Sequence, residues 1–182
     1  MVVGSGLVTM AVPEPLVPVV DGACLEAMTQ ALRADGEGAM AGGDDLNRLL
    51  GRISAVAIGP GMGTGDGARH TLEDLLDRWD GPLLLDADAL NLLAGRIERV
   101  AGRRTPPVMT PHPGELARLL ATDTASVLAD RLGAARRVAQ LAGSVVDAAI
   151  NAPGRIASTL NRTGNALVSL ARDSVHLITT RE

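Results

Sequence analysis

Apolar residues along this chain occur in two patterns, short uninterrupted runs and longer stretches at helical spacing, and the two patterns alternate. Short apolar runs are typical of buried strands, whereas apolar residues three and four positions apart are typical of helices that cover a sheet. The runs predict strands at 6–12, 53–58, 83–85 and 107–110. The helical spacing predicts helices at 25–33, at 66 or 67 to about 79, and at 90–94, 113–120 and 125–142. This alternation indicates a three-layer α/β/α fold around a mostly parallel sheet.

The segments between and after these elements predict turns and loops. Pro13 and Pro15 are expected to end the first strand, and the glycine-rich residues 34–45 are expected to form a surface loop. Asp123 or Thr124 is expected to cap the helix at 125–142. In the last forty residues the pattern predicts a strand at 144–150, a turn at 151–154, a return strand at 155–159 and a turn at 161–165. Residues 166–182 predict no cap, glycine loop or packing helix.

Composition excludes several kinds of chemistry. Trp79 is the one aromatic residue among 182, so stacking of a base or nicotinamide ring on an aromatic side chain is nearly excluded. All 17 basic residues are arginines, which rules out a lysine Schiff base, a P-loop lysine and a lysine general base. A formal net charge of −4 predicts no partnership with nucleic acid or with an anionic membrane surface.

The single cysteine, Cys24, allows neither a disulfide framework nor a cysteine metal cluster. Its setting resembles a helix start, and we interpret it as a structural or incidental thiol. No basic segment followed by a long apolar stretch marks the beginning of the sequence, and no apolar run approaches membrane-spanning length. A cytoplasmic protein is therefore expected.

Three glycines at alternate positions, Gly59, Gly61 and Gly63, follow the apolar run at 53–58. Glycines allow the backbone to approach a ligand closely and expose amides toward an anion, to which the N-terminus of the helix beginning near Asp66 adds its positive end. Taken alone, the loop is equally compatible with a tight turn. The polar motifs that follow the next two strands favour the binding interpretation.

The first of these motifs contains Asp86, Asp88 and Asn91 after the run at 83–85. Residues two apart in an extended segment point to the same side, so both carboxylates are expected to face one cleft. They are suited to binding hydroxyl groups or holding a cation through water. Capping of the following helix is the structural alternative, for which Asp88 is well placed, and the amide of Asn91 lies within reach of the same cleft.

The second motif contains His112 and Glu115 after the run at 107–110. Pro113 suits the first position of a helix, which places His112 at the helix entrance and Glu115 one turn inside it. We expect His112 to contact a ligand, while Glu115 is either a site residue or the acid of a capping box. The other histidines, His70 and His176, are expected to lie on the surface.

The three motifs together resemble those of the ADP-dependent NAD(P)H-hydrate dehydratases, metabolite-repair enzymes with a ribokinase-like fold. The resemblance is carried by the segments at 59–63, 86–91 and 110–115, with weaker similarity at 4–9 and 25–28. It implies that water is eliminated from hydrated NADH or NADPH while ADP or ATP is split to phosphate. It further implies Mg²⁺ with the nucleotide, small-molecule nucleotide partners and a possible homo-oligomer.

The resemblance also implies roles for individual residues. Gly61, Gly63 and His112 would contact the hydrated dinucleotide. Gly59, Asp86, Asp88, Asn91 and Glu115 would line the nucleotide and phosphate cleft, with no residue ligating the metal directly.

The sequence departs from the family pattern after residue 146. The family has a lysine-glycine pair after its long helix and later a glycine-rich loop that carries the catalytic aspartate. Here the position of that base falls on Val175, with Asp173 two residues away as a weaker candidate, and the catalytic residue is left unassigned. The chain is therefore expected to be one partial domain, 1–182, family-like over 4–146 and divergent over 147–182.

These departures leave three hypotheses for function. The first is a dehydratase of this family, with little or no activity expected from the altered tail. The second is a non-catalytic nucleotide-binding remnant or interaction subunit with the same fold. The third is a ribokinase-like small-molecule kinase. It requires the same missing glycine-rich loop, so the sequence does not favour it over the first hypothesis.

Overall fold

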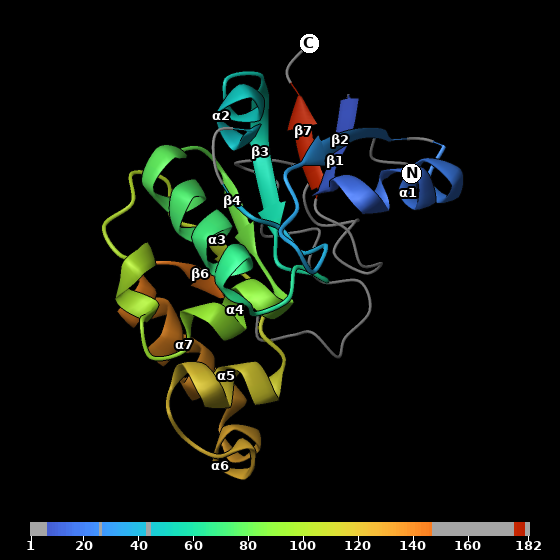
Figure 1. Cartoon of the computed structure of the whole chain (residues 1–182). Helices are drawn as coiled ribbons and strands as arrows, with labels where there is room; N and C mark the ends of the chain where they lie inside the picture. The colour runs from blue at the N-terminus through green and yellow to red at the C-terminus, as the bar shows by residue number, and fades with distance from the viewer. Residues whose placement is uncertain (1–6, 26, 43–44, 147–176, 181–182) are drawn as a thin grey trace.

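The computed structural model describes residues 7–25, 27–42, 45–146 and 177–180 (Figure 1). The strands are β1 (Leu7–Pro13), β2 (Met28–Leu32), β3 (Ile53–Ile58), β4 (Leu83–Leu85), β5 (Val108–Met109), β6 (Val145–Val146) and β7 (Leu177–Thr180). The α-helices are α1 (Val17–Ala23), α2 (Asp45–Leu50), α3 (Asp66–Arg78), α4 (Ala87–Leu93), α5 (Pro113–Leu119), α6 (Thr124–Ala129) and α7 (Arg131–Ala142). Two short 3₁₀ helices, η1 (Glu14–Leu16) and η2 (Ile97–Val100), complete the described elements.

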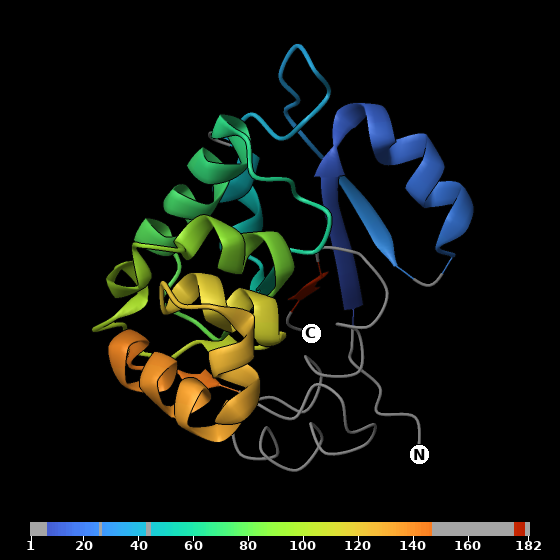
Figure 2. The same cartoon turned by 90° about the horizontal axis from the view of Figure 1, so that it is seen from below.

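The described strands form one sheet in the order β2-β1-β7-β3-β4-β5-β6. Neighbours from β3 to β6 are parallel, as are β1 and β2, whereas β7 runs antiparallel to both β1 and β3. The chain steps in one direction across the sheet from β3 to β6, so right-handed crossovers place the connecting helices on one face. The step from β1 to β2 has the opposite direction, and α1 accordingly lies on the other side of these strands from α3 and α4 (Figure 2).

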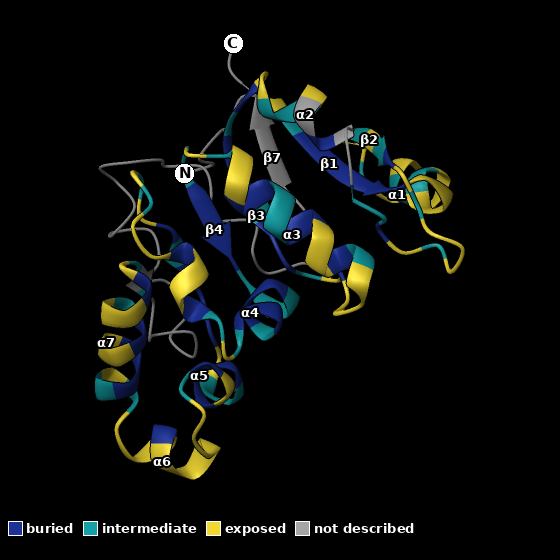
Figure 3. Cartoon of the chain, turned by 60° about the vertical axis from the view of Figure 1, so that its left-hand side comes forward, coloured by how far each residue is buried: buried dark blue, intermediate teal, exposed yellow. Residues whose placement is uncertain are grey.

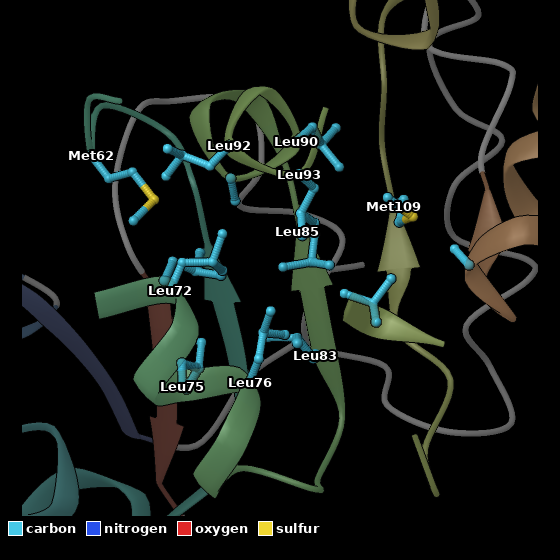
Figure 4. Close-up of a cluster of buried hydrophobic side chains, with 14 of the residues drawn as sticks. Met62, Leu72, Leu75, Leu76, Leu83, Leu85, Leu90, Leu92, Leu93 and Met109 are labelled. Carbon is cyan, nitrogen blue, oxygen red and sulfur yellow. The ribbon is translucent and has the colours of Figure 1, made fainter. Parts of the chain in front are cut away.

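The main core lies between the sheet and the helices that connect β3 to β6. Side chains of a strand alternate between its faces, and Leu83 and Leu85 join the cluster that contains Leu72, Leu75 and Leu90. Figure 4 shows these leucines packed between α3, α4 and β4, with Met62 and Met109 at either side. The intervening Leu84 points to the opposite face, where it packs with Ala55. The buried strands and the buried sides of the helices form the dark interior of Figure 3.

Arginines in and next to η2 contact α3 and the residue after it through ion pairs and hydrogen bonds. Arg99 bridges Glu73 and Asp77, with contacts of 2.6 and 2.8 Å, and Arg96 lies 2.9 Å from Glu73. Arg103 donates to the backbone carbonyls of Leu76 and Trp79. These contacts fix the approach to β5, because η2 immediately precedes that strand.

The structure confirms the predicted mixed α/β fold with a mostly parallel sheet. The strands at 53–58 and 83–85 have the predicted bounds, and the helices α3 and α5 end within one residue of theirs. The expected cap at Asp123 is also present, since its side chain accepts a hydrogen bond from the amide of Ser126 at 2.8 Å. None of the described helices combines the length and apolar character needed to cross a bilayer.

The predicted helix at 25–33 is wrong, because residues 28–32 form the strand β2 along β1. The helix lies earlier instead, where Pro15 and Pro18 occupy the first turns of η1 and α1. Proline suits the first turn of a helix because its missing N–H has no intrahelical partner there, so these prolines start helices as well as ending a strand. Cys24 consequently caps the C-terminus of α1 rather than beginning a helix.

The structure also differs from the prediction at the long helix, in the tail and at one short helix. The helix expected at 125–142 is broken at Asp130, whose backbone leaves the helical region and whose side chain caps the amide of Gly133 at 2.8 Å. Residues 177–180, for which no element was expected, form β7 within the sheet. The helix α2 within 45–50 was also missed. Of the strand expected at 144–150 the structure has β6, and the turns and return strand expected at 151–165 lie outside the described residues.

Replacing Leu85 by alanine tests the core. Leu85 is fully buried in β4, between β3 and β5. Loss of its side chain leaves a cavity, so we expect Leu85→Ala to lower the free energy of unfolding by about 2–5 kcal/mol. Urea unfolding followed by circular dichroism measures this change. Leu128→Ala is the matched control, because Leu128 is 57% exposed on α6, and its effect is expected to stay below about 1 kcal/mol. Equal losses in the two variants would contradict this description of the core.

Candidate functional site

The three predicted motifs meet at one edge of the sheet. The strands β3, β4 and β5 are adjacent and parallel, so their carboxyl ends lie side by side. The backbone continues this pairing past the strands, since the amide of Asp86 donates to the carbonyl of Ile58 and the amide of Thr110 donates to that of Leu85. In an open α/β sheet this carboxyl edge is where ligands bind.

Gly59 is held against the backbone of the next strand. Its φ of +134° is a conformation that side chains rarely allow. A Cβ at this position would lie 1.7 Å from the carbonyl oxygen of Asp86. Gly59 therefore makes the close contact between the β3 and β4 ends possible, which is a structural reason for glycine at this position.

The other two glycines face open space. Gly61 and Gly63 have φ of +71° and +74°, and a Cβ at either position would meet no atom within 4 Å. Between them, Met62 is buried in the core and its amide donates to the carbonyl of Gly59, which anchors the loop. The helix α3 begins directly after this loop with no side-chain cap at Gly65, so its N-terminal amides add positive potential there.

Asp86 is the N-cap of α4, so the capping alternative applies to Asp86 and not to Asp88. The Asp86 Oδ1 accepts a hydrogen bond from the amide of Ala87 at 2.9 Å. The following Ala87 has a φ of +45°, a left-handed conformation that is strained for a residue other than glycine. This bend places Asp88 in the first turn of α4 instead of before it, and so frees its side chain to reach another segment.

The side chain of Asp88 reaches back to the glycine loop. Its Oδ2 accepts a hydrogen bond from the amide of Gly63 at 3.0 Å, and its Oδ1 accepts one from the Asn91 Nδ2 at 3.3 Å. Asn91 in turn accepts at its Oδ1 from the Arg118 Nη1 at 2.8 Å. These contacts join the segments that follow β3, β4 and β5 in one continuous polar chain.

His112 and Glu115 form a reciprocal capping box at the start of α5. The Nδ1 of His112 accepts from the amides of Gly114 and Glu115, while the amide of His112 donates to the Glu115 Oε2 at 2.8 Å. Because Nδ1 accepts, the neutral ring carries its proton on Nε2, which lies 3.1 Å from the Glu115 Oε1. The imidazole remains 52% exposed, so its outer surface is open to a ligand.

Glu115 is a buried carboxyl group at the base of this arrangement. Burial raises the pKa of Glu115 above its ordinary 4.5, and the neighbouring charge of Asp86 acts in the same direction. The hydrogen bond from the His112 amide and the charges of His112 and Arg118 oppose this rise. Glu115 therefore stabilises α5 as a cap while retaining a bias toward its protonated form.

The carboxylates at this edge are not arranged as a direct metal cage. Across the part of the chain that the structure describes, no three His, Cys, Asp or Glu side chains are grouped to hold an ion. A separate small hollow lies between β1, β2, β3, α2 and α3. Its lining is apolar, including Leu32, Met40, Val56 and Leu75, and offers nothing to a phosphate.

The structure thus brings together the predicted residues of all three motifs, Gly59, Gly61, Gly63, Asp86, Asp88, Asn91, His112 and Glu115. Val175, Asp173 and His176 lie outside the described residues. His70 is on the exposed side of α3, 3.6 Å from Asp74, as expected of a surface residue.

Two residues of the site were not predicted from the sequence. Met62 anchors the glycine loop in the core, and Arg118 ends the polar chain on α5. The spacing of Arg118 from Glu115, three residues along one helix, is the signal that would have placed it on the side of α5 that carries the site.

The fold defines an α/β protein, and the three motifs meet at the carboxyl ends of β3, β4 and β5 as a candidate ligand site. Residues 1–166 match the family model described as NAD(P)H-hydrate dehydratase. The chain therefore belongs to the NAD(P)H-hydrate dehydratase family.

Curated relatives agree with this assignment. The bifunctional NAD(P)H-hydrate repair enzyme Nnr of Moorella thermoacetica is 41% identical over 140 residues, which cover 75% of this chain and 26% of the relative. The bifunctional NAD(P)H-hydrate repair enzyme of Leishmania infantum is 38% identical over 185 residues, covering 91% of this chain and 32% of the relative. The chain thus spans about a third or less of the length of these two relatives.

Solved structures confirm the ribokinase-like fold. The ADP/ATP-dependent NAD(P)H-hydrate dehydratase of Bacillus subtilis, co-crystallised with ATP and Mg²⁺ and soaked with CoA, superimposes with a TM-score of 0.58. It is 24% identical, and the match covers 78% of this chain and 47% of that one.

Alanine substitutions in the glycine loop separate close packing from backbone strain. Gly59→Ala meets the Asp86 carbonyl, so we expect strain and overpacking together to lower the unfolding free energy by about 2–5 kcal/mol. The added methyl group in Gly61→Ala meets no neighbour, so we expect only the strain of the positive φ to lower the unfolding free energy, by about 1–2 kcal/mol. Urea unfolding of both variants measures the difference. A Gly59→Ala protein no less stable than Gly61→Ala would contradict the close contact.

The raised pKa of Glu115 predicts a pH dependence of stability. A carboxyl group with a folded pKa above its unfolded value binds more protons when folded, so the free energy of unfolding falls as pH rises from about 4.5 through the folded pKa. Glu115→Gln keeps an acceptor for the His112 amide and removes the ionisation. Relative to wild type, we expect this variant to gain about 1.4 kcal/mol across the window for each unit by which the folded pKa is raised.

Urea unfolding at pH values on both sides of the window provides the test. Glu98→Gln, at an exposed position on η2, is the matched control for removal of one carboxylate. Parallel stability profiles of the wild type and Glu115→Gln would show that the Glu115 pKa is not raised.

Proposed function

We propose that this chain binds a hydrated nicotinamide dinucleotide and an adenine nucleotide at the carboxyl edge of β3, β4 and β5, and that it dehydrates the first at the expense of the second. In this reaction ADP or ATP is split to phosphate and water is removed from NADHX or NADPHX. Family membership supports the reaction, and the polar chain that joins the three strand ends is the observation that carries the site.

The glycine loop is suited to the anionic part of these ligands. Gly61 and Gly63 leave open space above the backbone, and the N-terminus of α3 follows within a few residues. Backbone amides and a helix N-terminus bind phosphate without a lysine, as this lysine-free chain requires. We assign Gly61, Gly63 and the exposed side of His112 to the dinucleotide.

We assign the phosphate side of the cleft to Asp86, Asp88, Asn91 and Glu115, with Gly59 shaping its floor. Asp86 Oδ1 is engaged by Ala87, and no other described residue donates to its Oδ2, which suits it to a water of a bound cation. Mg²⁺ carried by the nucleotide phosphates would neutralise their charge and polarise the bond that breaks. Asp88 and Glu115 use their oxygens on backbone amides and so position the loop and helix around that group.

Phosphorylation of the ring hydroxyl would convert it into a good leaving group. The terminal phosphoryl group would pass to the hydroxyl oxygen, and loss of phosphate with a ring proton would restore the reduced nicotinamide. The base for this step stays unassigned, because Val175 and Asp173 lie outside the described residues. A cytoplasmic location and self-association of the chain remain part of the proposal.

Turnover of purified NADHX with ADP and Mg²⁺, followed by the absorbance of the NADH formed, tests the proposal directly. ADP-dependent formation of NADH by the folded chain is the result that the proposal predicts, at the low rate expected from the altered tail. Binding of NADPH and ADP, measured by calorimetry, is the companion experiment. Binding without turnover would favour the non-catalytic remnant, and absence of both from a folded chain would overturn the proposed function.

The variant Gly61→Val tests, by calorimetry, whether NADPH binds at the glycine loop. The side chain at this position enters the open space above the loop, so we expect at least a tenfold loss of NADPH affinity, about 1.4 kcal/mol. Gly95→Val is the matched control, because Gly95 has a φ of +74° and an equally open surrounding on the loop after α4. Equal affinity losses in the two variants would place the dinucleotide elsewhere.

A further inference from the structure

The polar chain from Gly63 to Arg118 contains one cation, and that cation lies at its far end. The Arg118 Nη1 donates to the Asn91 Oδ1 at 2.8 Å, the Asn91 Nδ2 donates to the Asp88 Oδ1 at 3.3 Å, and the Gly63 amide donates to the Asp88 Oδ2 at 3.0 Å. Arg118 thus lies on α5, 27 residues from Asn91, and is connected through α4 to the loop that precedes α3. No part of this connection follows from local sequence.

The hydrogen bonds between Arg118, Asn91 and Asp88 can form with only one orientation of the Asn91 amide. A guanidinium has donors and no acceptor, so it requires the carbonyl oxygen of the Asn91 amide to face it. The amide nitrogen of Asn91 then faces residue 88, and because this nitrogen is a donor, the side chain at residue 88 must be an acceptor. The carboxylate of Asp88 meets this requirement with one oxygen and holds the Gly63 amide with the other. Reversal of the Asn91 amide would place two donors together at Arg118 and two acceptors together at Asp88.

We propose that Arg118 is a positioning residue for the glycine loop: through Asn91 and Asp88 it fixes the orientation of the Gly63 amide at the ligand edge. Arginine suits this position better than a single-point cation because its planar donors hold a carbonyl oxygen in one direction. The side chain of Arg118 is exposed at the surface of α5, so its removal leaves no buried cavity. The effect of Arg118 on the Gly63 amide does not depend on any ligand, whereas its consequence for catalysis rests on the proposed function.

The Gly63 amide can be observed selectively. Met62–Gly63 is the single methionine–glycine pair in the sequence, so isotope labels on the methionine carbonyl carbon and the glycine nitrogen report one peptide bond by nuclear magnetic resonance. We expect Arg118→Met to move this amide proton toward the position of a free amide. Its hydrogen exchange should accelerate about five- to thirtyfold, the factor that corresponds to one or two kcal/mol.

Asn91→Asp is the sharper variant, because it is nearly isosteric and keeps an acceptor for Arg118. It replaces the donor toward Asp88 by a second carboxylate, so the inference predicts the same loosening of the Gly63 amide although the Arg118 contact persists. Arg136→Met, an exposed arginine exchange on α7, is the matched control and should leave the Gly63 signal unchanged.

A double-mutant cycle separates this connection from a general structural effect. Once Asp88→Ala has removed the link to Gly63, Arg118→Met should not accelerate exchange of this amide further. An unchanged Gly63 signal in Arg118→Met, or an equal effect of Arg118→Met with and without Asp88, would overturn the inference.

Turnover measurements separate this inference from the proposed function. If the wild type dehydrates NADHX, Arg118→Met should raise KM for NADHX with a smaller effect on kcat, because a loop that binds ground state and transition state alike contributes to uniform binding. A wild type without turnover or nucleotide binding would overturn the proposed function, while the Gly63 signal would still decide the role of Arg118. Turnover with an unaltered KM in Arg118→Met would overturn the consequence for substrate binding, while the Gly63 signal still decides whether Arg118 positions the loop.

Discussion

The close contact between the backbones of Gly59 and Asp86 is the constraint on which the site depends. A side chain at residue 59 would overlap the Asp86 carbonyl, so the ends of β3 and β4 reach this separation only with glycine. After that contact the glycine loop leads into open space at Gly61 and Gly63, and the chain after β4 bends sharply at Ala87 into α4. Both features bring the side chain of Asp88 within reach of Gly63.

Side chains that are suited to ligand chemistry also cap helices in this structure. Asp86 caps α4, and His112 and Glu115 cap α5 reciprocally. The same atoms therefore determine where each helix begins and which groups face the carboxyl edge of the sheet. This double use leaves Asp86 Oδ1, His112 Nδ1 and Glu115 Oε2 hydrogen-bonded to backbone amides, so these side chains are held in fixed orientations at the edge.

The sheet combines two halves that meet at an antiparallel strand. The strands from β3 to β6 form a continuous parallel unit with its helices on one face, whereas β1 and β2 form a second parallel pair with α1 on the other. Between them β7 pairs with both halves. The candidate site residues that the structure describes belong to the first half, so the geometry of their loops follows from the packing of α3, α4 and α5 on β3, β4 and β5.

The sequence by itself determined the parallel α/β class, the order of the three motifs and most residues of the carboxyl edge, because buried strands, glycines and polar strand ends leave local signals. It misplaced Met28–Leu32 as a helix, since pairing with β1 outweighs local helix preference in so short a segment. It offered Asp88 as the better placed cap of α4, whereas the bend at Ala87, which local sequence does not indicate, gives that role to Asp86. Tertiary structure alone decided the position of β7 and the link from Arg118 to Gly63, because both depend on contacts between residues far apart in the chain.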